Sequence, residues 1–199
     1  MPTIRLFPSL ALMNRFWQVA AIFYAMTSFS RAGEPVKSFP WEAPKVVASI
    51  FTQDLGMLDS EREEYATNLA TIASNHLAKA KASPASLADA RRLLALALQL
   101  SPRNKRAVVV NFQLTKGMLP EVTESVYSPS VFARLILTRG QLLAKQGGEE
   151  NQKLARYFIQ LAAELDPKNE DAVYASEVQR LDHGGVDWSP VTDPEGRKN

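Results

Sequence analysis

The side chains that most often perform chemistry are sparse in this chain and poorly spaced for it. The only histidines are His76 and His183, and neither lies at metal-ligand spacing from a cluster of carboxylates. There is no glycine-rich phosphate loop, no Gly-x-Ser-x-Gly motif and no nucleophile–base pair of the kind that hydrolases use. The sequence therefore predicts a protein with no catalytic residues, no metal site and no cofactor.

The positions of these polar residues indicate structural roles instead. His76 falls on the apolar stripe of its predicted helix, where a hydrogen-bonded packing histidine is expected. His183 precedes a glycine pair and is expected to face the negative end of a helix dipole. Pairs of carboxylates fall at predicted helix starts, where they stabilise the positive end of the dipole: Glu63-Glu64, Glu149-Glu150 and Glu170-Asp171.

The composition is that of one folded domain preceded by an export signal. Of 199 residues, 46% are apolar and 22% are charged, which is sufficient for a globular core. Residues 1–32 contain three arginines, no acid, an apolar run over Phe16–Phe29 and small residues before Gly33. This pattern predicts a signal peptide cleaved after Ala32, with Met13 as an alternative start. The other interpretations are an uncleaved membrane anchor, which alone would bring membrane contact, and a buried first helix.

We therefore expect an exported protein, periplasmic or secreted, and its charge must be counted without the signal. The remaining chain has 20 basic and 21 acidic residues, a net charge of −1, so no nucleic-acid partner is expected. The chain has no cysteine, which excludes disulfides and thiolate zinc sites.

One internal repeat organises the chain. Ala90–Val108 (ARRLLALALQLSPRNKRAV) recurs without a gap as Ala155–Val173 (ARYFIQLAAELDPKNEDAV), with nine of 19 positions identical. In each copy apolar residues recur at helical spacing, a proline stops the helix, and an asparagine two residues later can cap a new one. Each copy therefore predicts a helix, a tight turn and a second helix.

The pattern Ala-x3-large apolar-x2-Ala-x4-Pro resembles the second helix of a tetratricopeptide repeat and its closing turn. It is carried by Ala90, Leu94, Ala97 and Pro102, and again by Ala155, Ile159, Ala162 and Pro167. With the family's unit of about 34 residues, the resemblance covers residues 71–181. It implies an all-α fold of six or seven antiparallel helices, paired in a short right-handed superhelical stack.

The repeats are degenerate. The Trp, Leu-Gly and Tyr of the family's first helix are replaced by Ser74, Leu77-Ala78 and Lys81, and then by Arg139, Leu142-Leu143 and Gln146. Between the copies, Pro120–Tyr127 is cramped for a full second helix.

Capping patterns and breakers suggest the domain limits. Ser60 with Glu63, and Ser86 with Asp89, form capping-box patterns that predict helix starts. We expect a proline-containing lead-in with a short helix over residues 33–59 and a TPR-like repeat domain over 60–183. A flexible tail follows over 184–199, where only Trp188 offers a means of docking.

Charge is uneven along the mature chain. Lys79–Lys116 contains eight basic residues against one acid, whereas the segments before and after it each have a net charge of −4. One interpretation is a solvated face that pairs with acids of neighbouring repeats. The other is a surface for an acidic partner or a lipid headgroup.

The candidate partner site lies on the first helices of two repeats, because such helices line the concave side in the family that the chain resembles. Arg106, Val109 and Gln113 share one face at three- and four-residue spacing, and Tyr174 begins the corresponding face of the last helix. An acidic or mixed peptide would meet Arg106 at one end and the Tyr174 ring at the other. The alternative is that Val109 packs in the core and Arg106 is solvated.

The sequence thus predicts a non-enzymatic, exported TPR-like scaffold or adaptor that binds a protein or peptide partner. The alternative is an accessory or regulatory part of an exported or membrane-associated enzyme system.

Overall fold

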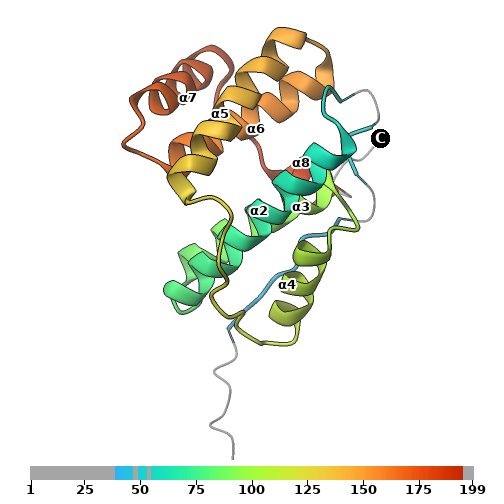
Figure 1. Ribbon diagram of the computed structural model, residues 1–199. Helices are drawn as coiled ribbons and strands as arrows, with labels where there is room; N and C mark the ends of the chain where they lie inside the picture. The colour runs from blue at the N-terminus through green and yellow to red at the C-terminus, as the bar shows by residue number, and fades with distance from the viewer. Residues whose placement is uncertain (1–38, 47–48, 53–54, 195–199) are drawn as a thin grey trace, which may run out of the picture. The chain divides into compact units, whose positions relative to one another are not determined.

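A computed structural model describes residues 39–46, 49–52 and 55–194, and all regular secondary structure in these ranges is helical. The helices are α2 (Asp59–Lys79), α3 (Pro84–Leu100), α4 (Lys105–Thr115), α5 (Pro129–Gln146), α6 (Glu149–Leu165), α7 (Glu170–His183) and α8 (Ser189–Thr192) (Figure 1). The expected all-α class is confirmed for this part of the chain. None of its helices has the length and apolar character that a membrane span requires. The predicted signal peptide lies outside the described residues.

The turn between the two helices of each repeat copy forms as the sequence predicts. α3 ends at Leu100 and α6 at Leu165, each two residues before its proline, because proline disfavours helical geometry in the residue that precedes it. The Asn104 side chain accepts a hydrogen bond from the backbone N–H of Ala107 at 2.9 Å and so caps α4. Asn169 caps α7 in the same way.

The repeated unit in space contains three helices rather than two. When the two copies of the repeat are aligned, α3 and α6 coincide at both ends, and α4 and α7 begin at the same position. α2 pairs with α3 as α5 pairs with α6, and the third helix of each unit packs on its own pair. Residues 117–128 contain no helix, so an extended segment separates the units instead of the second helix of an intervening pair.

Aromatic rings and two ion pairs join the two units among the described residues; one of these pairs is Arg92 of α3 with Glu164 of α6, at 3.2 Å. The Tyr65 ring of α2 lies 5.5 Å from the ring of Phe158 and 5.7 Å from that of Phe132, measured between centroids. Nearby, Arg139 of α5 forms an ion pair with Glu61 of α2, with 2.7 Å between Nε and Oε1. Burial, followed by the charge of Glu61, raises the pKa of Tyr65 to about 12.

Close approach of α5 and α6 explains a glycine inside a helix. A Cβ added at Gly140 would lie 3.1 Å from the Cβ of Phe158 and 3.2 Å from the backbone oxygen of Ala155. A larger residue would therefore push the two helices apart. The close packing that glycine allows offsets the usual cost of glycine in a helix interior.

The C-terminal half of α3, residues 93–100, is apolar on nearly every side, and all of these residues are buried. A helical segment of this kind is stable only when it is buried all round. α2 and α4 pack on it, and so does the short C-terminal helix α8. Phe51 of the lead-in and Val191 of α8 belong to the same core cluster as the α3 leucines.

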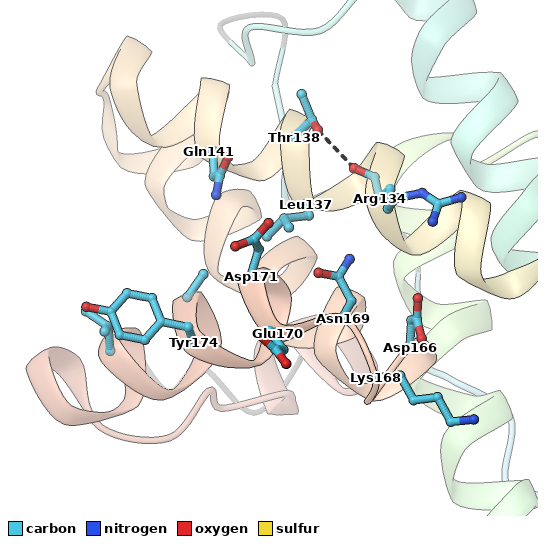
Figure 2. A pocket seen from close by; sticks show the side chains of 12 residues that line it. Arg134, Leu137, Thr138, Gln141, Asp166, Lys168, Asn169, Glu170, Asp171 and Tyr174 are labelled. Atoms are coloured by element: carbon cyan, nitrogen blue, oxygen red, sulfur yellow. Dashed lines mark hydrogen bonds between the residues drawn. The ribbon is translucent and has the colours of Figure 1, made fainter.

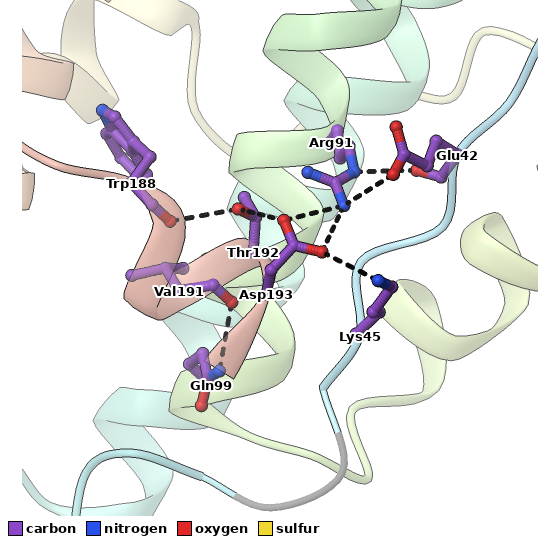
Figure 3. Close-up of polar contacts among 8 residues, drawn as sticks. All are labelled: Glu42, Lys45, Arg91, Gln99, Trp188, Val191, Thr192 and Asp193. Carbon is purple, nitrogen blue, oxygen red and sulfur yellow. Dashed lines mark hydrogen bonds and ion pairs between the residues drawn. The ribbon is translucent and has the colours of Figure 1, made fainter. Parts of the chain in front are cut away.

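The side chain of Gln99 joins the lead-in and α8 to α3, and Figure 3 shows its bond to Val191 of α8. Gln99 is fully buried. Its Oε1 accepts a hydrogen bond from the backbone N–H of Ile50 at 2.8 Å, and its Nε2 donates to the backbone oxygen of Val191 at 3.1 Å. A buried amide must be hydrogen-bonded to be tolerated, so this residue specifies which two segments cover the helix.

A second set of contacts reinforces this arrangement. The backbone N–H of Lys45 donates to the backbone oxygen of Thr192 at 2.8 Å. Arg91 of α3 forms an ion pair with Asp193 at 2.9 Å and donates to the backbone oxygen of Glu42 (Figure 3). The hydrogen bonds from Arg91 hold the pKa of Asp193 below its usual value.

Two segments therefore differ from their predicted structure. Residues 39–46 and 49–52 contain no helix, because their backbone groups bond to other parts of the chain rather than to one another. The tail predicted to be flexible is docked as far as residue 194: Val191 is fully buried, and Trp188 packs on the Tyr157 ring at 4.8 Å. Apolar cover for α3 is the physical reason for both differences.

Both predicted capping boxes are wrong. α2 begins at Asp59 with Leu58 as N-cap, and Glu63 instead accepts hydrogen bonds from Ser101 and Asn104, which binds α2 to the α3–α4 turn. α3 begins at Pro84, with the hydroxyl of Ser83 as the cap, because proline is favoured in the first turn of a helix.

The predicted packing role of His76 is also wrong, since the residue is exposed near the end of α2. The apolar stripe continues there through Leu77 instead. The carboxylates of Glu149-Glu150 and Glu170-Asp171 do lie in first helical turns, as predicted.

Replacing Gln99 by leucine should lower the free energy of unfolding by about 2–3 kcal/mol, because the partners in Ile50 and Val191 lose their hydrogen bonds. Hydrogen exchange should also increase in residues 49–52 and 188–194. Gln141→Leu, at an exposed position of α5, is the matched control for the denaturation measurement. Equal effects of the two changes would contradict the role given to Gln99.

The raised pKa of Tyr65 predicts a loss of stability in alkali. Below about pH 10 the tyrosine is neutral in both states; between pH 10 and 12 it ionises more readily in the unfolded chain, so stability falls as pH rises. Tyr65→Phe should reduce this alkaline loss of stability by about 1–2 kcal/mol. The effect is smaller than the whole pKa shift implies, because the ring is only half-buried and solvent screens its charge. Tyr174→Phe, in a ring that is 74% exposed, should leave the alkaline slope of chemical denaturation curves unchanged.

Candidate functional site

The residues predicted to bind a partner lie in two separate places. Arg106, Val109 and Gln113 are on α4, which packs on α2 and α3, whereas Tyr174 is on α7, which packs on α6 and α5. Figure 1 shows α4 and α7 at different sides of the helical body. The structure therefore does not bring Tyr174 together with the three α4 residues.

Arg106 is engaged within the protein and is neither free nor simply solvated. Its Nη2 donates to Ser74 Oγ at 2.7 Å and to Thr123 Oγ1 at 2.9 Å. Burial lowers the pKa of this guanidinium. Gln113, further along α4, is also partly buried, while Val109 is 40% exposed and does not fill the core.

Thr123, one of the two residues bonded to Arg106, belongs to an extended segment, residues 118–127, that lies across α2 and α4. Asn75 of α2 holds the backbone of Thr123 from both sides: its Nδ2 donates to the Thr123 oxygen at 2.8 Å, and its Oδ1 accepts from the Thr123 N–H at 2.9 Å. Tyr127 donates to Glu64 at 2.8 Å, and Pro120 is buried. The first unit thus holds this segment by two hydrogen bonds to the Thr123 backbone and by side-chain contacts on either side of it, in the way that a groove holds a peptide.

The second unit has a groove of about 860 Å³ between the equivalent helices, α5 and α7 (Figure 2). The side of the groove on α5 is formed by Arg134, Leu137, Thr138 and Gln141. The side on α7 is formed by Glu170, Asp171, Tyr174, Ala175 and Val178, and the α6–α7 turn supplies Asp166, Lys168 and Asn169. Tyr174 is thus the one predicted site residue that lines this groove.

The groove has an apolar part and a charged end. Leu137, Ala175 and Val178 provide the apolar surface of the groove together with the Tyr174 ring. Acids and bases gather near the start of α7 (Figure 2). Three acids stand against two bases there, so the charge is slightly negative. Asp171 occupies the repeat position that Arg106 has in the first unit, so the two units differ in charge at the same place.

The side chains that line the groove are one aromatic ring, a few apolar groups, and charged, hydroxyl and amide groups. Its described residues include no histidine and no cysteine, and no group of three or more potential metal ligands occurs among the described residues of the chain. A shallow cleft with an aromatic ring, apolar walls and a few charges suits an extended segment of another protein.

The α5 side of the groove was not identified from the sequence. Arg134, Thr138 and Gln141 recur at helical spacing in a segment already predicted to be a helix, so the signal was present. Recognising it requires knowing that α5 and α7 both pack on α6 and so lie beside each other.

Replacing Asn75 by alanine should release the segment 118–127 from the first unit. Two hydrogen bonds to the Thr123 backbone are lost, at about 1 kcal/mol each for partly exposed groups. Hydrogen exchange and proteolysis within residues 118–127 should increase, with the rest of the chain unaffected. Gln141→Ala, on the equivalent helix of the second unit, is the control. If residues 118–127 are as protected from exchange and proteolysis in Asn75→Ala as in the unaltered chain, this account is contradicted.

Comparison with known proteins leaves the family open: no protein-family model matches this chain, and no curated protein or solved structure does either. The likeness to tetratricopeptide repeats therefore rests on the sequence pattern alone.

Proposed function

We propose that this chain is a non-enzymatic, TPR-like scaffold that holds an extended segment of a partner protein in the groove between α5 and α7. One observation carries the proposal: the first unit binds the chain's own segment 118–127 across α2 and α4, whereas the equivalent helices of the second unit form an open groove. A fold that already secures extended chain in one unit is suited to do so in its copy.

The charges of the groove define the partner further. The sequence led us to expect an acidic partner bound to Arg106. We no longer propose this contact, because that guanidinium is already bound to Ser74 and Thr123. At the α5–α7 groove, Asp166, Glu170 and Asp171 favour a segment that combines apolar residues with a lysine or arginine. Function outside the cytoplasm is part of the proposal and is supported by the signal-peptide pattern of residues 1–32.

Removing the apolar side chains of the groove should abolish partner capture. In the double variant Tyr174→Ala, Val178→Ser, the loss of two apolar contacts should weaken binding at least about tenfold, since each is worth about 1–2 kcal/mol when buried by a partner. A photoreactive amino acid at position 138, inside the groove, cross-links bound proteins of the native envelope fraction. Mass spectrometry then quantifies the captured proteins.

The matched control is Val126→Ser, at a side chain that is 81% exposed outside the groove. It should capture the partner as the unaltered chain does. Equal capture by the groove variant and by the control would remove this groove from consideration. An enzyme among the captured proteins would favour the accessory role over a general scaffold.

A further inference from the structure

Two helices of this protein carry exposed stripes at the same positions of the repeat. The α4 stripe consists of Lys105, Val108, Val109, Phe112 and Lys116. The α7 stripe occupies the aligned positions of the second copy and consists of Glu170, Val173, Tyr174, Glu177 and Leu181. The residues of each stripe recur mainly at intervals of three and four, so each set lies along one side of its helix.

Both stripes face away from the core. The buried residues of α4 are Ala107, Val110 and Leu114, and those of α7 are Ala172 and Gln179, none of which belongs to a stripe. The outer positions are nevertheless apolar: Phe112 is 57% exposed, and Leu181 is 74% exposed. Outer faces of surface helices are normally polar, so two apolar stripes at equivalent positions indicate surfaces that another molecule covers.

The charges of the two helices are opposite. From Lys105 to Lys116 there are three basic residues and no acid, a net charge of +3. From Glu170 to His183 there are four acids and one arginine, a net charge of −3 with neutral histidine. The α4 stripe has a lysine at each end, and Lys116 Nζ lies 5.6 Å from the Phe112 ring centroid. In the α7 stripe, Glu170 takes the position of Lys105, and Glu177 takes that of Phe112.

We infer that the α4 stripe of one molecule packs against the α7 stripe of a second copy of this chain. A single contact of this kind covers both apolar stripes and neutralises both charged helices. Because the two stripes differ, two copies can exchange both contacts about a two-fold axis, or one contact can repeat head-to-tail and build a ring or a chain of molecules. The inference does not rest on the proposed groove: Glu170 and Tyr174 border both surfaces, but Val173 and Leu181 lie outside the groove.

Disulfide trapping tests the contact directly, because the full chain contains no cysteine of its own. A chain with Phe112→Cys is mixed with a chain with Val173→Cys under mild oxidation. We expect a cross-linked 112–173 dimer at least tenfold more abundant than the product of the control pair, Val126→Cys with Val173→Cys. The yield should fall in 1 M salt, where screening shortens the range of charge interactions to about 3 Å.

Charge reversal provides the second test. Lys105→Glu with Lys116→Glu should abolish the cross-link, and adding Glu170→Lys with Glu177→Lys to the same chains should restore it, because both stripes are then reversed together. Lys145→Glu, at the end of α5 and outside both stripes, is the control and should have no effect. The melting temperature of each variant verifies folding.

Several outcomes would overturn the inference. A 112–173 yield no greater than that of the control pair would exclude the contact, as would failure of the fourfold reversal to restore it in folded protein. Predominant 112–112 cross-links would indicate a two-fold contact between α4 helices instead. If only vesicles that contain phosphatidylglycerol protect the thiol introduced at position 112 from thiol reagents, the α4 stripe binds an anionic lipid surface and not a second copy.

Discussion

The structure depends on the need to bury the C-terminal half of α3 on all sides. Apart from Gln99, residues 93–100 are leucines and alanines, so no side of this half can face water without a large cost in apolar exposure. α2 and α4 cover part of it, and the remaining surface is closed by the lead-in and by a segment from near the C-terminus. The one uncharged polar side chain in its last turn, Gln99, finds its partners in those two segments. The lead-in and α8 are therefore parts of the core rather than appendages.

The two three-helix units show how one backbone design can take different roles. Their central turns are alike, with a proline that stops one helix and an asparagine that caps the next. The outer chemistry has diverged: the first unit has an arginine bound to its own chain where the second has Asp171 at the edge of a groove. Similar packing with dissimilar surfaces is typical of repeat proteins, in which contacts between neighbours maintain the fold and exposed positions are free to change.

Some local features of the fold were predictable from the sequence, although both predicted capping boxes were wrong, and distant pairings were not predictable. The caps at Asn104 and Asn169 depend on residues within one turn, so the pattern was sufficient. The partners of Gln99 are 49 and 92 residues away, and no periodicity reports such a pairing. The same limit applies to the candidate site: Tyr174 was found from its helical face, but the α5 side of its groove depends on how α5 and α7 pack. Trp188 and the apolar character of residues 93–100 were the sequence signals for the docked tail.

Covering α3 with residues from near the C-terminus has a consequence for biosynthesis. Gln99 is synthesised 92 residues before Val191. At about 5–20 residues per second, the growing chain therefore exposes part of its most apolar helix for roughly 5–20 s before the closing segment exists. During this interval the nascent chain resembles a client of holding chaperones, and a ribosome that stalls after α7 would release a product with an open core. Quality control should accordingly detect the loss of α8 almost as readily as damage to α3 itself.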